Sequence, residues 1–119
     1  MRPLNSVFEN NQERKLFILK IKELIKIGFN NIEIPWQESI NWFNLMSSLR
    51  SEFPKLNLGS ASNLNKKSID DSRKLHLNFS MMRFWDKELF NYARSKNHLL
   101  IPGISNYIDL QEAISYECN

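Results

Sequence analysis

The spacing of hydrophobic and polar residues changes several times along the chain. Residues 12–28 repeat apolar side chains every three or four positions, which predicts an amphipathic helix ended by Gly28. Its buried side is expected to carry Phe17, Ile18, Ile21, Leu24 and Ile25. Residues 31–34 then predict a short buried strand, and residues 38–53 predict a second helix that ends before Pro54.

The same alternation continues toward the C-terminus. The pattern predicts further strands at 55–61, 77–82 and 98–105, and further helices at 65–75, 86–97 and 108–116. Strands that alternate with helices indicate βαβ units and a parallel sheet. Such units place reactive groups at the C-terminal ends of the strands. We therefore expect an α/β fold with any site at that edge of the sheet.

One acidic residue interrupts the first predicted strand. Glu33 stands between Ile32 and Ile34, so its side chain takes the opposite face of the strand from both isoleucines. A carboxylate in this position is either a structural acid with a partner or part of a reacting site. A buried structural glutamate needs a paired cation, and the local sequence offers none.

The composition fits one globular domain, residues 1–119, with 42% hydrophobic and 24% charged residues. The net charge of +3 comes from dispersed lysines, which favours no nucleic-acid partner. Cys118 is the single cysteine and no apolar run suits a membrane span, so we expect a cytoplasmic protein without a membrane partner. Nucleotide-binding and metal-ligand motifs are absent from the sequence, and His76 and His98 are isolated.

Four segments in order resemble one enzyme family. They are IKIGFNNIEIPW, FPKLNLGSASNLN, LNFSMMRFWDKELFNYA and LLIPGIS, and the match runs from about residue 16 to 113. In these segments the chain is similar to the bacterial 2-keto-3-deoxy-6-phosphogluconate (KDPG) and 4-hydroxy-2-oxoglutarate aldolases. The resemblance implies parallel βα units of a (β/α)8 barrel of the TIM type, present here as an incomplete, roughly half barrel.

The resemblance also implies a reaction and a site. The family releases pyruvate from a small 2-keto acid by a retro-aldol cleavage, through a Schiff base on a lysine. By this resemblance Glu33 is the catalytic glutamate that moves protons through a bound water. The implied substrate-binding residues are Arg2, Gln37, Ser62, Arg83 and Ser105. We expect a pyruvate-type substrate and no metal or other cofactor.

The chain departs from the family pattern at these positions. Gln37 stands where an arginine is common, and an amide cannot form a bidentate charged clamp on a carboxylate. Ser62 replaces a threonine but keeps the hydroxyl, and Ala61 replaces a glycine of the turn. Arg83 occupies a usual proline position, where it either replaces the lost cation or is an ordinary surface residue.

The sequence ends at Asn119, before the strand that carries the Schiff-base lysine in the family. A complete barrel of this type needs roughly 200 residues or more, so we expect about half a barrel with an unpaired sheet edge. We expect the chain alone to be inactive. The implied partners are a complementing second half-barrel or further copies of the chain, in a trimer by family resemblance.

Two other functions stay open at this point. The first is a non-catalytic binding or assembly subunit that pairs with a second half-barrel. The second is a small α/β domain that binds a ligand at its strand ends without chemistry. A lysine-bearing continuation in the downstream DNA would favour a split aldolase over both.

Overall fold

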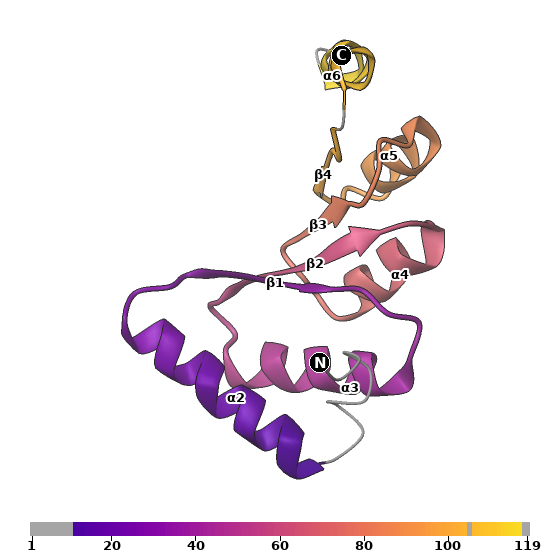
Figure 1. Ribbon diagram of the computed structural model, residues 1–119. Helices are drawn as coiled ribbons and strands as arrows, with labels where there is room; N and C mark the ends of the chain where they lie inside the picture. Colours follow the sequence, from indigo (N-terminus) through magenta and orange to yellow (C-terminus); the bar gives the residue numbers. More distant parts are fainter. Residues whose placement is uncertain (1–10, 105, 118–119) are drawn as a thin grey trace.

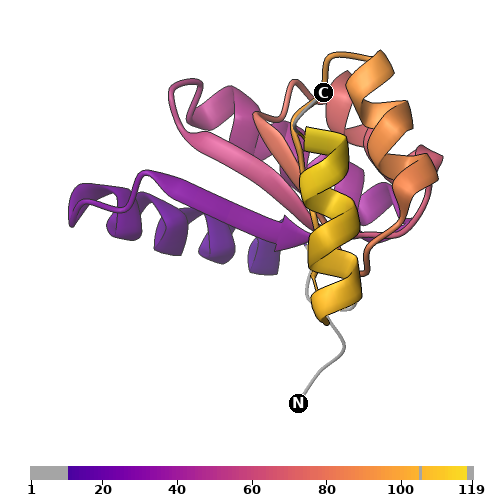
Figure 2. The same ribbon diagram turned by 90° about the horizontal axis from the view of Figure 1, so that it is seen from above.

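The computed structural model describes residues 11–104 and 106–117. Helices and strands alternate through this part of the chain, as the hydrophobic pattern predicts. The elements are α2 (Asn11–Lys26), β1 (Asn31–Pro35), α3 (Ile40–Glu52), β2 (Asn57–Asn63), α4 (Lys66–Lys74), β3 (Phe79–Met82), α5 (Lys87–Ser95), β4 (Leu100–Ile101) and α6 (Tyr107–Glu117). Figures 1 and 2 place α2 and α6 at opposite ends of the arrangement.

The strands form a single parallel sheet. Their order is β1-β2-β3-β4, and each pair of neighbours runs in the same direction. Because strands adjacent in the chain are also adjacent in the sheet, the order never reverses, unlike that of a doubly wound sheet. This confirms the predicted α/β fold of successive parallel βα units.

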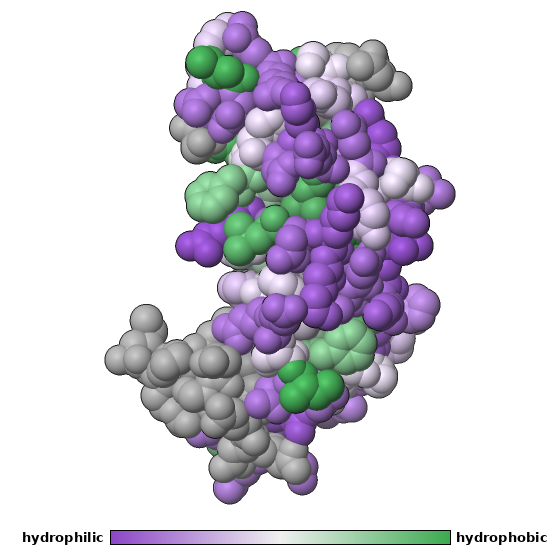
Figure 3. Space-filling model, turned by 90° about the vertical axis from the view of Figure 1, so that its right-hand side faces the viewer, coloured by the Kyte–Doolittle hydropathy of each residue, from purple (hydrophilic) through white to green (hydrophobic). Residues whose placement is uncertain are grey.

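One face of the sheet is covered by the helices (Figure 1). Trp42, Leu45, Met46 and Leu49 of α3 are fully buried and pack in one core with Ile34 of β1 and Leu58 of β2. A second core joins α4 and α5 to β3 and β4 through Ile69, Met82, Leu89, Phe90, Ala93 and Leu100. The outer side of the helical layer is mostly hydrophilic, with separate apolar patches (Figure 3).

Helix α2 is less buried than its sequence predicts. Of its five expected core residues only Ile21 is buried, while Phe17, Ile18 and Ile25 are partly buried. Leu24 is 38% exposed, so its assignment to the core is wrong. In the described part of the chain α2 lies at the edge of the arrangement, next to α3 (Figure 1), and Leu16, Leu19 and Leu24 of this helix are exposed.

The other face of the sheet, which we call the inner face, carries Glu33, Gly59, Phe79, Met81 and Ile101. The strand registers place these residues side by side, opposite Ile34 and Leu100. Phe79 lies on Gly59 so closely that a Cβ there would be 2.4 Å from the ring. Glu33 is exposed and Ile101 is 37% exposed, whereas Phe79 between them is buried, so the inner face is open at β1 and β4 in the described part of the chain.

Candidate active site

Glu33 lies in the middle of β1 rather than at its end. Its Cα pairs with Gly59, and the strand continues to Pro35, which pairs with Ala61. The Trp36 N–H then donates to the Ala61 carbonyl at 2.8 Å, which extends the ladder by one more bond. The carboxylate therefore projects from the open inner face about two residues below the C-terminal edge of the sheet.

Ser62 lies at a β-bulge beyond the level of Glu33. The pairing of β2 with β3 shifts between Ser60 and Asn63, and Ser62 has a left-handed φ of 55°. Ser62 comes three residues after Gly59, the partner of Glu33, which corresponds to about 10 Å along a regular strand. A site shared by Glu33 and Ser62 requires their side chains to approach each other across this offset, and that approach stays a prediction.

Gln37 belongs to the loop between β1 and α3. Its side chain is half-buried, and its Oε1 is buried without a hydrogen-bond donor among the described residues. A buried acceptor without a donor costs free energy until a donor reaches it. The Gln37 Oε1 is thus an acceptor without a described donor, and its amide offers no positive charge.

Arg83 follows β3 at the same edge of the sheet. Its N–H donates to the Asn63 carbonyl at 3.1 Å, and its guanidinium lies 5.5 Å from the centre of the Phe84 ring. Gly103 packs against this backbone, because a Cβ there would lie 2.9 Å from the Met82 carbonyl oxygen. The turn after β4 is therefore held next to Arg83. Arg2 and Ser105 lie outside the described residues.

A hollow of about 440 Å³ opens beside these strand ends. It is lined by Asn63, Leu64, Phe84, Trp85, Asp86, Lys87, Glu88, Leu89 and Glu112. Three carboxylates against one lysine make it a poor place for the negative groups of a keto acid. None of the candidate site residues that the structure describes lines this hollow, so we take the open inner face as the candidate site.

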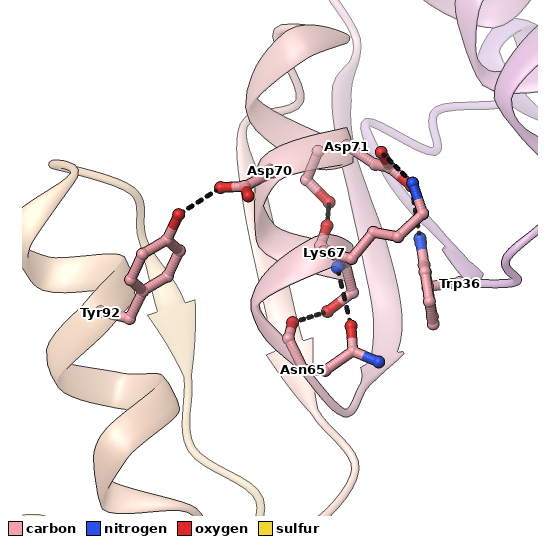
Figure 4. A network of polar contacts seen from close by, with 8 residues as sticks. Trp36, Asn65, Lys67, Asp70, Asp71 and Tyr92 are labelled. Atoms are coloured by element: carbon pink, nitrogen blue, oxygen red, sulfur yellow. Dashed lines mark hydrogen bonds and ion pairs between the residues drawn. The ribbon is translucent and has the colours of Figure 1, made fainter.

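The β1–α3 loop is tied to α4 by a buried carboxylate (Figure 4). Asp71 is 7% exposed and accepts from the Trp36 indole N–H at 3.1 Å. Lys67 approaches its other oxygen at 3.5 Å, and Asn65 caps the start of the same helix. This contact could not be predicted from the sequence, because α4 has the composition of a polar surface helix and Asp71 lies 35 residues from Trp36.

Removing the acceptor at position 71 should destabilise the fold more than removing its charge. Asp71→Asn keeps an oxygen for the Trp36 indole, whereas Asp71→Leu leaves this partly buried donor without its partner. We expect Asp71→Leu to cost about 1–3 kcal/mol of unfolding free energy and Asp71→Asn clearly less. Urea denaturation of both variants measures this, and equal costs would show that the indole bond contributes nothing.

The four described strands carry no lysine. The lysines of the described region lie on helices or turns, and Lys67 is paired with Asp71. Among the described residues no group of three or more His, Cys, Asp or Glu side chains is placed to hold a metal ion. No described helix has both the length and the apolar character of a membrane span.

No protein-family model and no curated protein sequence matches the chain, but solved structures do. It superposes on KDPG aldolase from Legionella pneumophila with a TM-score of 0.75 and 18% identity, over 87% of this chain and 48% of that one. KDPG aldolase from Zymomonas mobilis gives 0.74 and 19%, over 96% and 58%. The 4-hydroxy-2-oxoglutarate aldolase from TTHB1 gives 0.72 and 16%, over 82% and 48%.

The chain has the fold of half a KDPG-aldolase barrel. It spans about half the length of the solved aldolases that it matches, while nearly all of its own length is used in the match. The open inner face of the half-barrel therefore corresponds to the interior of the complete barrel in these structures. At this level of identity the likeness establishes the fold and not the activity.

Proposed function

We propose that this half-barrel is one part of a class I aldolase that cleaves KDPG or 4-hydroxy-2-oxoglutarate to pyruvate and an aldehyde. The observation that carries the proposal is Glu33, a carboxylate on the open inner face of a sheet that superposes on these aldolases. An acid on the interior face of a (β/α)8 barrel, near the C-terminal edge, is where the fold places its reacting groups.

In the proposed reaction Glu33 exchanges protons with the substrate through a water molecule. The retro-aldol step removes a proton from the substrate hydroxyl, breaks the neighbouring C–C bond and returns a proton to the pyruvate carbon. Gln37 supplies the unpaired acceptor described above, and Ser62 supplies a hydroxyl at the edge of the sheet. Arg83 is the cation of this edge that we assign to the substrate carboxylate.

The Schiff-base lysine has to come from elsewhere. Without that lysine there is no electron sink for the bond cleavage, so Glu33 alone cannot catalyse it. We propose that the remaining βα units of the barrel supply the lysine, either as a second half-barrel or as a continuation of the same polypeptide. The 119-residue chain by itself is then inactive.

A non-catalytic half-barrel is the second candidate. It is favoured by the distance of about 10 Å along the strand between the levels of Glu33 and Ser62, and by an amide in place of a charged clamp at Gln37. Such a chain would still pair with a second half-barrel, but the assembled barrel would bind a ligand without cleaving it.

A complementation assay separates the two candidates. The chain is mixed with a polypeptide holding the βα units of the Legionella pneumophila enzyme that it does not cover, and pyruvate release from KDPG is followed with lactate dehydrogenase. We expect pyruvate only when both polypeptides are present. A stable complex without pyruvate release would favour the binding subunit, and pyruvate from the 119-residue chain alone would refute the proposed origin of the lysine.

A further inference from the structure

Buried hydroxyl groups fill the space between the sheet and α4, where apolar side chains are usual. Ser60 of β2, Ser72 of α4 and Ser80 of β3 are all fully buried. The Ser60 Oγ lies 2.7 Å from the Ser72 Oγ and 2.8 Å from the Ser80 Oγ. These three hydroxyls therefore form one continuous hydrogen-bonded row across two strands and a helix.

His98 closes one end of this row. It precedes β4 and is half-buried, and its Nε2 lies 2.7 Å from the Ser80 Oγ. The His98 backbone is fixed as well, because its N–H donates to the Ala93 carbonyl at the end of α5, at 2.9 Å. At the other end of the row, the Ser72 hydroxyl donates to the Ser68 carbonyl at 2.8 Å.

The number of hydrogens fixes the direction of every bond in the row. Four bonds join the Ser68 carbonyl, Ser72, Ser60, Ser80 and His98, and each needs one hydrogen. A serine hydroxyl has one hydrogen and a carbonyl has none, so the serines supply three. The fourth must come from the imidazole.

We infer that His98 is the terminal donor of a one-way hydrogen-bond chain that fastens β4 to β3, β2 and α4. The order of donation is His98 Nε2–H to Ser80, Ser80 to Ser60, Ser60 to Ser72, and Ser72 to the Ser68 carbonyl. We call this row the His98 chain.

The surroundings of Ser60 agree with this direction. The Asn63 Nδ2 donates to the Ser60 Oγ at 3.1 Å, which fills the acceptor site that Ser80 leaves free. The Asn63 Oδ1 lies 3.4 Å from the Ser60 Oγ, too far to compete with Ser72 at 2.7 Å. Ser60 therefore accepts twice and donates once, and its hydrogen-bonding capacity is complete.

The direction decides what the Ser80–His98 pair can do. A serine nucleophile needs a histidine that accepts its proton, and here the imidazole donates instead. Ser80 is also fully buried, so no substrate reaches it. The Ser80–His98 hydrogen bond therefore has a structural role, and we call this pair of residues the latch. It supports the weakest strand of the sheet, because β4 pairs with β3 through only two residues, Leu100 and Ile101.

Protonation of His98 keeps its hydrogen bond to Ser80, but a charged imidazole at this position lowers the free energy of unfolding. Burial lowers the pKa of His98 below 6.5, and the charge of Arg73 on α4 lowers this pKa further. Arg94 of α5 lines the same hollow as His98, and its guanidinium donates to the Tyr116 carbonyl. Because Nε2 carries a hydrogen in both the neutral and the charged imidazole, the bond to Ser80 persists at either protonation state.

The latch therefore makes the fold sensitive to acid. The unfolded chain takes up the proton near pH 6.5, above the pKa of His98 in the folded chain, so the free energy of unfolding should fall as the pH drops below about 6.5. The fall should stop once His98 is charged in the folded chain too. His98→Gln should remove this slope and His76→Gln should keep it, as measured by urea denaturation between pH 5 and 8.

Nitrogen NMR of the histidine side chains tests the direction of the His98 chain directly. In the 119-residue chain at pH 8, with His76→Gln for assignment, we expect the hydrogen of His98 on Nε2 and a bare Nδ1. A hydrogen on Nδ1 with Nε2 accepting from Ser80 would overturn the inference. The hydrogen is located in the parent chain, which carries no substitution in the latch, and His76→Gln serves only to assign the His98 signals.

Hydrogen exchange tests the latch itself. The Ser80 N–H donates to the Leu99 carbonyl at 2.9 Å and reports on the pairing of β3 with β4. His98→Gln keeps an N–H donor, whereas His98→Met has a similar size and none. We expect the Ser80 amide to exchange at least 10-fold faster in His98→Met than in His98→Gln. Equal exchange rates in the two variants would show that donation from position 98 does not hold β4.

Discussion

Replacing Trp42 by alanine is expected to cost about 3–5 kcal/mol of unfolding free energy, the usual cost of emptying a fully buried tryptophan site. Trp42 is 0% exposed and lies at the centre of the core that joins α3 to β1 and β2. A domain of this size is stable by about 5–15 kcal/mol, so the loss is a large part of the total. Urea denaturation followed by circular dichroism measures it.

Trp42→Phe is the matched control. The Trp42 Nε1 is buried without an acceptor among the described residues, so phenylalanine removes an unsatisfied donor while it keeps most of the ring volume. We expect Trp42→Phe to stay within about 1.5 kcal/mol of the parent chain. A cost below about 1 kcal/mol for Trp42→Ala would show that this core is not the one that holds the sheet.

In the barrel completed by a lysine-bearing half, Glu33→Gln is expected to slow aldol cleavage by roughly 100-fold or more, the usual loss for a positioned acid–base group. Glutamine keeps the shape of the side chain but cannot exchange a proton with the substrate. Because Glu33 lies exposed on the open inner face, the same change should alter the stability of the half-barrel by about 1 kcal/mol or less.

Glu52→Gln is the control for this prediction. Glu52 is an exposed residue at the end of α3, on the helical layer and away from the inner face. Glu52→Gln removes the same charge as Glu33→Gln and should leave the rate of pyruvate release unchanged. Full activity of the completed barrel with Glu33→Gln would show that Glu33 is not the proton-transfer group.

Most of the fold could be predicted from the spacing of hydrophobic and polar residues along the chain. Apolar side chains at helical spacing predict α3 and α5. The alternation in β1 predicts that Glu33 and Ile34 take opposite faces, and in the structure Ile34 is buried while Glu33 is exposed. Four strands alternating with helices are enough to predict a parallel sheet in chain order. These features depend only on which residues avoid water.

Polar contacts between distant segments could not be predicted in the same way. Hydropathy describes α4 as a polar surface helix, yet Ser72 and Asp71 are buried because partners from other elements satisfy them. The bulge at Ser62 could not be predicted either, because a serine in the left-handed conformation has no clear sequence signal.

Borohydride trapping with pyruvate tests the central claim, that the Schiff-base lysine is not among the residues of this half-barrel. The 119-residue chain is incubated with pyruvate, reduced with borohydride and measured by intact-protein mass spectrometry, with and without the complementing polypeptide. We predict no specific adduct on this chain under either condition, and an adduct on the complementing polypeptide. A pyruvate adduct on a single lysine of this chain, lost when that lysine is replaced by arginine, would contradict the account.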